Sequence, residues 1–439
     1  MQNGISRTQL DNGLLVLLKE IHTAPIISHW VWYRAGSRNE LAGYTGVSHW
    51  VEHMQFKGTS HFSGGTLDRE IARLGGVWNA FTYLDWTAYF ETLPADKIDL
   101  ALQLEADRMT NSLFEAQDVE AERTVIISER QGNENEPMFL LSEHIQATAF
   151  RVHAYHHEVI GEQVDLEALT RDDLMAYYRR HYAPNNAILT IAGDFDSHSM
   201  LARINELYGA IPAAEPPSMR VRPEPAQRGE RRVTVEGPGE TVYVQAAYHA
   251  PAATYPDFFA MTVLDSLLSG PSSLNMFGGG ISNKISRLYR ALVEKELAVG
   301  ISGELPATID PYLYSIAAIV HPERTAEEVI SALDEQIRLV QETPPSQEEV
   351  ARAVKQARAL FAYGSESITN QAFWLGFPEM FASYDWFSGY LEQLAAVTPQ
   401  DVQRVAQLYL QPRNRVLGIY LPDGPGVVDA EFVAEMGEV

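Results

Sequence analysis

One segment near the N-terminus has side chains of the types and spacing that bind zinc and hydrolyse amide bonds. It runs from Gly46 to Met54 and contains His49, Glu52 and His53 in a His-x-x-Glu-His motif. On a helix, residues four positions apart lie on one face, so the two imidazoles can bind the same metal ion. The carboxylate projects near the same point, where it can accept a proton from water. These are the groups of the His-Glu-x-x-His zinc helix in reverse order.

The alternative interpretation of this motif is a pair of surface histidines on a polar helix. The neighbouring side chains argue against it, since Val47, Trp50, Val51 and Met54 are apolar. Histidines and a carboxylate in so apolar a helix would be costly to bury without partners, and a bound metal removes that cost. The composition of the segment therefore favours a metal site.

A catalytic zinc site needs a third protein ligand. Hydrolytic zinc is usually held by three side chains and a water molecule, and two histidines with one glutamate are an established set. The chain contains no cysteine, which excludes thiolate ligands, disulfide bonds and a cysteine nucleophile. The third ligand must therefore be a carboxylate elsewhere in the chain, and spacing alone selects none. Nitrogen and oxygen ligands admit several metals, of which zinc is the expected one.

Motifs of one metallopeptidase family recur over most of the chain, more weakly in its second half. They are Gly36–Glu40, His49–Thr59, Gly75–Thr82, Glu122–Glu129, Tyr182–Asn186 and Ala192–Asp194. With them the chain resembles the inverzincin zinc metallopeptidases related to pitrilysin and to the mitochondrial processing peptidase. The resemblance implies an α+β fold of two similar domains, each a mainly antiparallel sheet with helices packed on one face. It also implies a zinc endopeptidase that cleaves peptides or unfolded segments, with Glu52 as general base on a zinc-bound water.

The resemblance also implies roles for residues outside the first motif. Glu129 is the implied third ligand of a single zinc ion per chain, and Glu122 is implied to support the site or to act in catalysis. These two glutamates are seven residues apart, so they share one face of a helix; without the family match, that face would be read as solvated. Asn79-Ala80-Phe81-Thr82 is the implied edge strand that binds an extended substrate through backbone hydrogen bonds. An ordinary internal strand is the alternative.

The second half departs from the family pattern at two positions. Active members resembling this chain carry an arginine and a tyrosine that contact the substrate or the developing oxyanion, and Val293 and Val299 stand at those places. Valine donates no hydrogen bond to an oxyanion. The resemblance therefore implies a two-subunit enzyme in which this chain carries zinc and a related subunit supplies the Arg/Tyr pair, with a heterodimer favoured over a homodimer. The alternative function is a non-catalytic, zinc-binding peptide-capture or assembly subunit of a larger complex.

Two helices must position the proposed ligands. The pattern predicts them near residues 46–56 and 116–130, with strands at 14–19, 26–34 and 83–93. A proline-rich, charged stretch predicts a linker at 216–231 between a zinc-binding catalytic domain, 1–215, and a similar domain without metal, 232–439. The segments 177–193 and 405–420 share a helix–turn–strand outline, which indicates a duplicated unit; convergence of common patterns is the alternative.

Charge and hydropathy limit the partners and the compartment. The formal net charge of −25 argues against nucleic-acid binding, which needs clustered lysine and arginine. It suits a basic peptide, or simply an acidic surface that keeps the protein in solution. No stretch approaches the roughly 20 apolar residues of a membrane span, and the N-terminus as written has no signal-peptide pattern. We therefore expect a cytoplasmic protein, or a periplasmic one if a leader has been removed.

Overall fold

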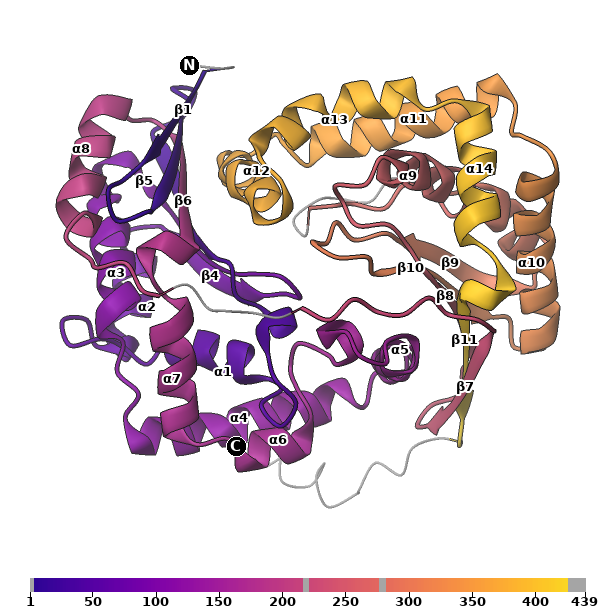
Figure 1. Ribbon diagram of the computed structural model, residues 1–439, viewed down its shortest axis with the longest axis horizontal. Helices are drawn as coiled ribbons and strands as arrows, with labels where there is room; N and C mark the ends of the chain where they lie inside the picture. The colour runs from indigo at the N-terminus through magenta and orange to yellow at the C-terminus, as the bar shows by residue number, and fades with distance from the viewer. Residues whose placement is uncertain (1–3, 216–220, 276–281, 425–439) are drawn as a thin grey trace.

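The two halves of the chain each contain one β-sheet, and they lie beside each other in the computed structural model (Figure 1). The structure describes residues 4–215, 221–275 and 282–424. The first sheet has six strands in the order β1-β2-β6-β3-β5-β4, and the second has five in the order β7-β11-β8-β10-β9. The strands of the first sheet are β1 (Ile5–Gln9), β2 (Leu15–Glu20), β3 (Ile26–Tyr33), β4 (Val77–Thr82), β5 (Thr87–Pro94) and β6 (Ala187–Gly193). Those of the second are β7 (Arg231–Gly237), β8 (Tyr243–His249), β9 (Ala298–Glu304), β10 (Leu313–Val320) and β11 (Arg415–Pro422).

Helices connect these strands in both halves. In the first half they are α1 (Val47–Met54), α2 (Gly64–Arg73), α3 (Asp99–Asn111), α4 (Ala116–Asn133), α5 (Pro137–Ala149), α6 (Gln163–Ala168), α7 (Arg171–His181) and α8 (Ser197–Tyr208). In the second half they are α9 (Asp257–Leu268), α10 (Ala326–Glu342), α11 (Gln347–Tyr363), α12 (Ile368–Phe381), α13 (Tyr384–Ala396) and α14 (Pro399–Tyr409). The two helices predicted to carry the metal ligands, near 46–56 and 116–130, are present as α1 and α4.

The two sheets share one topological feature. Each is antiparallel except for a single parallel pair, β2 with β6 and β7 with β11. The last strand of the first sheet, β6, lies between β2 and β3, and the last strand of the second sheet, β11, lies between β7 and β8. The helix before each of these strands begins at a threonine in a capping box, Thr170 for α7 and Thr398 for α14. Both halves therefore contain the same helix–turn–strand unit, which α8 follows in the first half, in agreement with the predicted fold of two similar α+β domains.

Each sheet is also covered by a helix from the other half. Helix α5 packs against β7, β8 and β11, and α12 packs against β2, β3 and β6; Figure 1 shows both exchanged helices at the junction of the halves. Because strand side chains alternate between faces, Trp30 and Trp32 of β3 point toward α12, where they contact Phe373 at ring-centroid distances of 5.7 and 5.4 Å. Val31 and Tyr33 belong to the core on the other face, with α1. Each half thus completes the core of the other.

The exchange of helices bears on the predicted division into domains. Helices α5 and α12 each pack on the sheet of the other half, so contacts cross the predicted boundary. The division into domains 1–215 and 232–439 with a linker at 216–231 stays a prediction. Of the predicted linker, residues 216–220 lie outside the described residues, and β7 begins at Arg231. Among the helices that the structure describes, none has the length and apolar character needed to cross a bilayer.

The packing of α12 on the first sheet predicts a large effect for a small substitution. A Cβ atom at Gly376 would lie 2.1 Å from Trp32 Nε1, and Trp32 is fully buried. We expect Gly376→Ala to lower the free energy of unfolding by about 1–3 kcal/mol, the usual cost of overpacking a core. Gly389→Ala in α13 is the matched control, because a Cβ there meets nothing within 4 Å. The control should be neutral or stabilising by up to about 1 kcal/mol through helix propensity, and equal urea-unfolding midpoints for the two variants would contradict the close packing.

Candidate metal centre

Helix α1 starts at a tightly constrained turn. Gly46, its N-cap, has a φ of 84°, and a Cβ there would lie 2.5 Å from the carbonyl oxygen of Ile160. The backbone N–H groups of Gly46 and Ser48 donate to the buried carboxylate of Glu40 at 2.9 and 2.8 Å, and the Ser48 hydroxyl donates to it as well. These contacts satisfy donors that the first turn of a helix leaves unpaired. The start of the helix is thereby fixed three positions before its first histidine.

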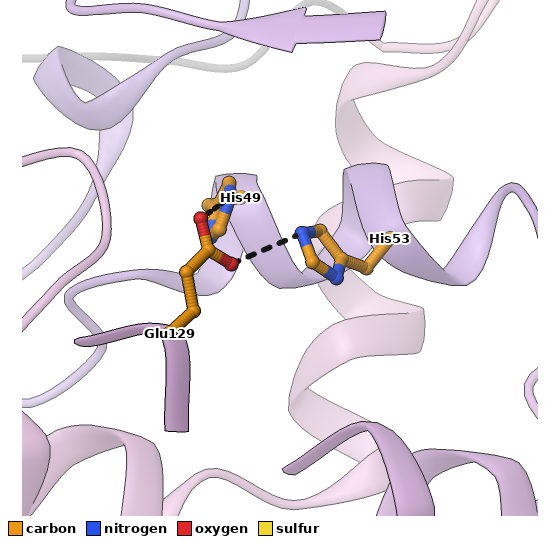
Figure 2. A group of neighbouring side chains, drawn as sticks. All are labelled: His49, His53 and Glu129. Carbon is orange, nitrogen blue, oxygen red and sulfur yellow. Dashed lines mark ion pairs between the residues drawn. The ribbon is translucent and has the colours of Figure 1, made fainter. Parts of the chain in front are cut away.

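Three potential ligands converge where α4 crosses α1. Their ligand atoms, from His49, His53 and Glu129, lie within 4.8 Å of one another. The two Nε2 atoms are 3.9 and 3.7 Å from the two oxygens of Glu129, and Figure 2 shows the carboxylate with one oxygen toward each ring. In a tetrahedral zinc site with bonds of about 2.0–2.1 Å, ligand atoms stand about 3.3 Å apart. The donor set and its spacing therefore fit a zinc ion after a small contraction.

The surroundings of the two histidines set the tautomer of His53 and the charge of His49. Glu122 of α4 lies 2.8 Å from Nδ1 of His53, a contact that holds the proton on Nδ1 and leaves Nε2 free to bind. Burial, then the charge of His53, lowers the pKa of His49 to about 3, so its ring is neutral, the form that binds metals. Burial would also lower the pKa of His53, but the hydrogen bond to Glu122 and the nearby carboxylates raise it overall.

Glu122 is buried and is not among the three residues whose ligand atoms converge. Its carboxylate forms an ion pair with Lys57 in addition to its contact with His53. Burial acts to raise the pKa of Glu122, but these two partners lower it overall, so the group is ionised at neutral pH. Lys57 was not among the predicted site residues, although it follows His53 by four positions and belongs to the family motif.

Glu52 lies on the same helix as the histidines and is 7% exposed. The hydroxyl of Thr82 donates to its Oε2 at 2.7 Å. Burial raises the pKa of Glu52, and the hydrogen bond from Thr82 only partly offsets this effect. A carboxylate with a raised pKa is a better proton acceptor near neutral pH than an exposed one.

The segment predicted to bind substrate forms β4, and β4 is the edge strand of the first sheet. It pairs with β5 on one side and is last in the strand order. Ala80 is buried, whereas Asn79, Phe81 and Thr82 are at least partly exposed. Thr82 ends the strand and contacts Glu52, a link between edge strand and metal site that sequence analysis did not identify. The edge of β4 is thus brought close to the candidate base.

The two valines of the second half lie on different elements. Val293 ends a short π-helical turn, Tyr289–Val293, and Val299 is an exposed residue of β9, the edge strand of the second sheet. Arg287 lies near them in sequence, but its guanidinium is 2.8 Å from Glu349 and so points toward α11.

Both halves of the chain match one family of peptidases. Residues 15–163 match the family described as insulinase, or peptidase family M16, and residues 168–357 match the peptidase M16 inactive domain. The first match contains His49, Glu52, His53 and Glu129, and the second contains Val293 and Val299. The three candidate ligands and the two valines therefore fall in separate family segments.

Individual relatives match over nearly the whole chain. An uncharacterized zinc protease of Streptomyces coelicolor is 27% identical over 423 residues, which cover 94% of this chain and 89% of the relative. The beta subunit of a mitochondrial-processing peptidase from Lentinula edodes is 26% identical over 94% of this chain and 88% of its own length. The crystal structure of a protease from Helicobacter pylori has a TM-score of 0.88 at 26% identity and covers 95% of this chain and 99% of that one.

Proposed function

Because the chain belongs to peptidase family M16, and a zinc protease of that kind matches it over 94% of its length, we propose that it is a zinc-dependent endopeptidase. His49, His53 and Glu129 hold one metal ion, and Glu52 is the general base. The observation that carries this proposal is the convergence of three ligand atoms within 4.8 Å beside a buried carboxylate on the same helix. A surface pair of histidines would need neither the third ligand nor the buried base.

The chain's own residues divide the chemical work. Zinc, when bound, supplies a Lewis acid that activates water and polarises a carbonyl group. Glu52 accepts the proton of the attacking water and passes it to the leaving amine, and Thr82 holds its carboxylate in place by the 2.7 Å hydrogen bond. Glu122 acts as a positioning residue, because it touches His53 and Lys57 rather than the reacting groups. It fixes the ring orientation of one ligand.

The substrate is an extended peptide that adds a strand at the edge of β4. Backbone hydrogen bonds to Asn79–Thr82 would hold the peptide without regard to its sequence. Thr82 both ends this strand and contacts Glu52, so a peptide paired along β4 passes the base at the strand's end. This geometry suits unfolded segments and short peptides, because a folded chain rarely offers a free extended backbone.

A second, related subunit completes the active site in this proposal. Val293 and Val299 supply no hydrogen-bond donor for an oxyanion, and one relative is named as the beta subunit of a mitochondrial-processing peptidase. We propose a heterodimer in which the partner provides an arginine and a tyrosine. The zinc-bearing chain alone then binds metal and peptide but cleaves slowly.

The test compares the chain purified alone with the chain co-purified with a homologous subunit from its native source. Cleavage of unfolded peptides is followed by mass spectrometry, with zinc content measured on the same samples. We expect zinc in both samples and rapid cleavage only in the assembled enzyme. Full activity of the isolated chain would contradict the proposed heterodimer but would still support the proposed peptidase activity. Bound zinc with no cleavage in either sample would contradict the peptidase and favour a peptide-capture or assembly subunit.

A further inference from the structure

A pocket lies behind the N-terminal turn of the metal-binding helix. Its walls come from α7, which packs against α1, from the loops that precede α1 and follow α5, and from Val221 and Arg222 in the segment before β7. Its volume is about 560 Å³, which is within the range of about 300–1,000 Å³ typical of small-molecule sites. None of the candidate ligands or substrate-binding residues lines it, so it is separate from the proposed active site.

Much of the pocket lining is apolar, and part of that lining is unusually exposed. Leu41 is 68% exposed and Tyr44 is 44% exposed, and both line the pocket. Val47, Val152 and Ala176 add further apolar surface. A ligand with an apolar body would cover these side chains.

The polar lining includes two arginines without an ion pair. Arg180 and Arg222 line the pocket as exposed side chains, and within the described residues neither forms an ion pair. The acidic groups nearby are already engaged: Asp173 accepts the hydrogen bonds of the capping box at Thr170, and Glu40 accepts those of the first turn of α1. In a chain with a net charge of −25, a pocket with two free guanidinium groups favours an anion.

A buried histidine adds an independent sign of a missing ligand. His181 lines the pocket and is only 3% exposed, and its Nδ1 has no hydrogen-bond partner among the described residues. Its ring lies 4.3 Å from that of Tyr177, which holds it in place. Burial, then the charge of Arg180, lowers the pKa of His181 to about 4, so the ring is neutral. Buried polar groups usually have partners, and among the described residues this ring nitrogen has none.

We propose that this pocket binds a small amphipathic anion, with one acidic group between Arg180 and Arg222 and an apolar body against Leu41, Val47 and Ala176. The apolar body would contact the apolar side chains of the lining, and the anionic group would contact the two arginines. The volume of the pocket limits the ligand to small-molecule size. The ligand would rest on Val47, the first residue of α1, two positions before His49. The site goes beyond the proposed peptidase activity and does not depend on it.

Titration with the fluorescent apolar anion 8-anilinonaphthalene-1-sulfonate tests the proposal on the full chain. We expect saturable binding of one probe per chain, weakened about tenfold or more in Arg180→Gln, since hydrogen bonds to a charged group are roughly twice as strong as those between neutral groups. Ala176→Trp, a substitution at an exposed position of α7, should abolish binding by filling the pocket. Arg179→Gln is the matched control, because this exposed neighbour does not line the pocket.

Competition identifies the chemistry of the ligand. Decanoate should displace the probe, and the uncharged alcohol 1-decanol should do so at least tenfold less well. Unchanged affinity in both Arg180→Gln and Ala176→Trp would overturn the proposal, because the probe would then bind elsewhere. Equal displacement by the acid and the alcohol would overturn the assignment of an anion. Thermal unfolding of each variant, measured without probe, keeps a loss of folding distinguishable from a loss of the site.

Discussion

Glu52→Gln is expected to leave the metal in place and to lower the kcat of peptide hydrolysis by a factor of about 10²–10⁴, the usual contribution of a general base. Glutamine has the same shape and can still accept the hydrogen bond from Thr82, which reaches Oε2 of Glu52 at 2.7 Å. It cannot accept a proton from water. The change therefore removes a chemical step without removing a ligand or a packing contact, and the assembled enzyme is measured for kcat, KM and zinc content.

Glu120→Gln is the control for this experiment. Glu120 lies on α4, is exposed, and pairs with Arg123 at 3.1 Å, so its amide should leave kcat unchanged. Zinc content equal to that of the unmodified enzyme shows that the site is intact in both variants. A Glu52→Gln enzyme within a few-fold of full activity would rule out Glu52 as the base.

The second large effect concerns the ligand most distant in sequence. Glu129→Gln should weaken zinc binding well beyond the 10–100-fold loss that follows removal of a residue supporting a ligand. A neutral amide is a poorer ligand than a carboxylate, and no other described carboxylate joins the two histidines within 4.8 Å. The Glu129 side chain is 42% exposed, so the substitution removes little packing. Competition with a graded zinc chelator measures the affinity without any need for activity.

Glu122→Gln gives the matched comparison, because it changes the partner of His53 and leaves the ligands themselves. Its zinc affinity should fall by about 10–100-fold, less than that of Glu129→Gln. Added zinc should raise the Tm of the unmodified chain, since a ligand that binds only the folded state stabilises it. The same shift should be smaller in Glu122→Gln and smallest in Glu129→Gln. The reverse order would assign the third ligand to Glu122.

The spacing of residues along the sequence was sufficient to predict the part of the candidate site that lies on one helix. His49 and His53 are four residues apart, and any helix brings such a pair to one face. Glu52 follows from the same argument, although only the structure gives its burial and its contact with Thr82.

The strand expected from Tyr83 starts at Thr87 instead, because Tyr83 N–H donates to the carbonyl of Trp86 and closes a turn between β4 and β5. Alternation of side chains does not distinguish a strand from the turn that leads into it.

The sequence by itself therefore determined the motif, its helix and the α+β class, together with the family resemblance that named Glu129. Spacing alone selected no third ligand, because the approach of α4 to α1 depends on contacts between residues far apart in the chain. Only the tertiary structure decided that α5 and α12 each cover the sheet of the other half. A helical pattern shows that one face of a helix is buried, but it does not show against which sheet. That choice rests on fitted surfaces, such as Gly376 against Trp32, which exist only once both halves have folded.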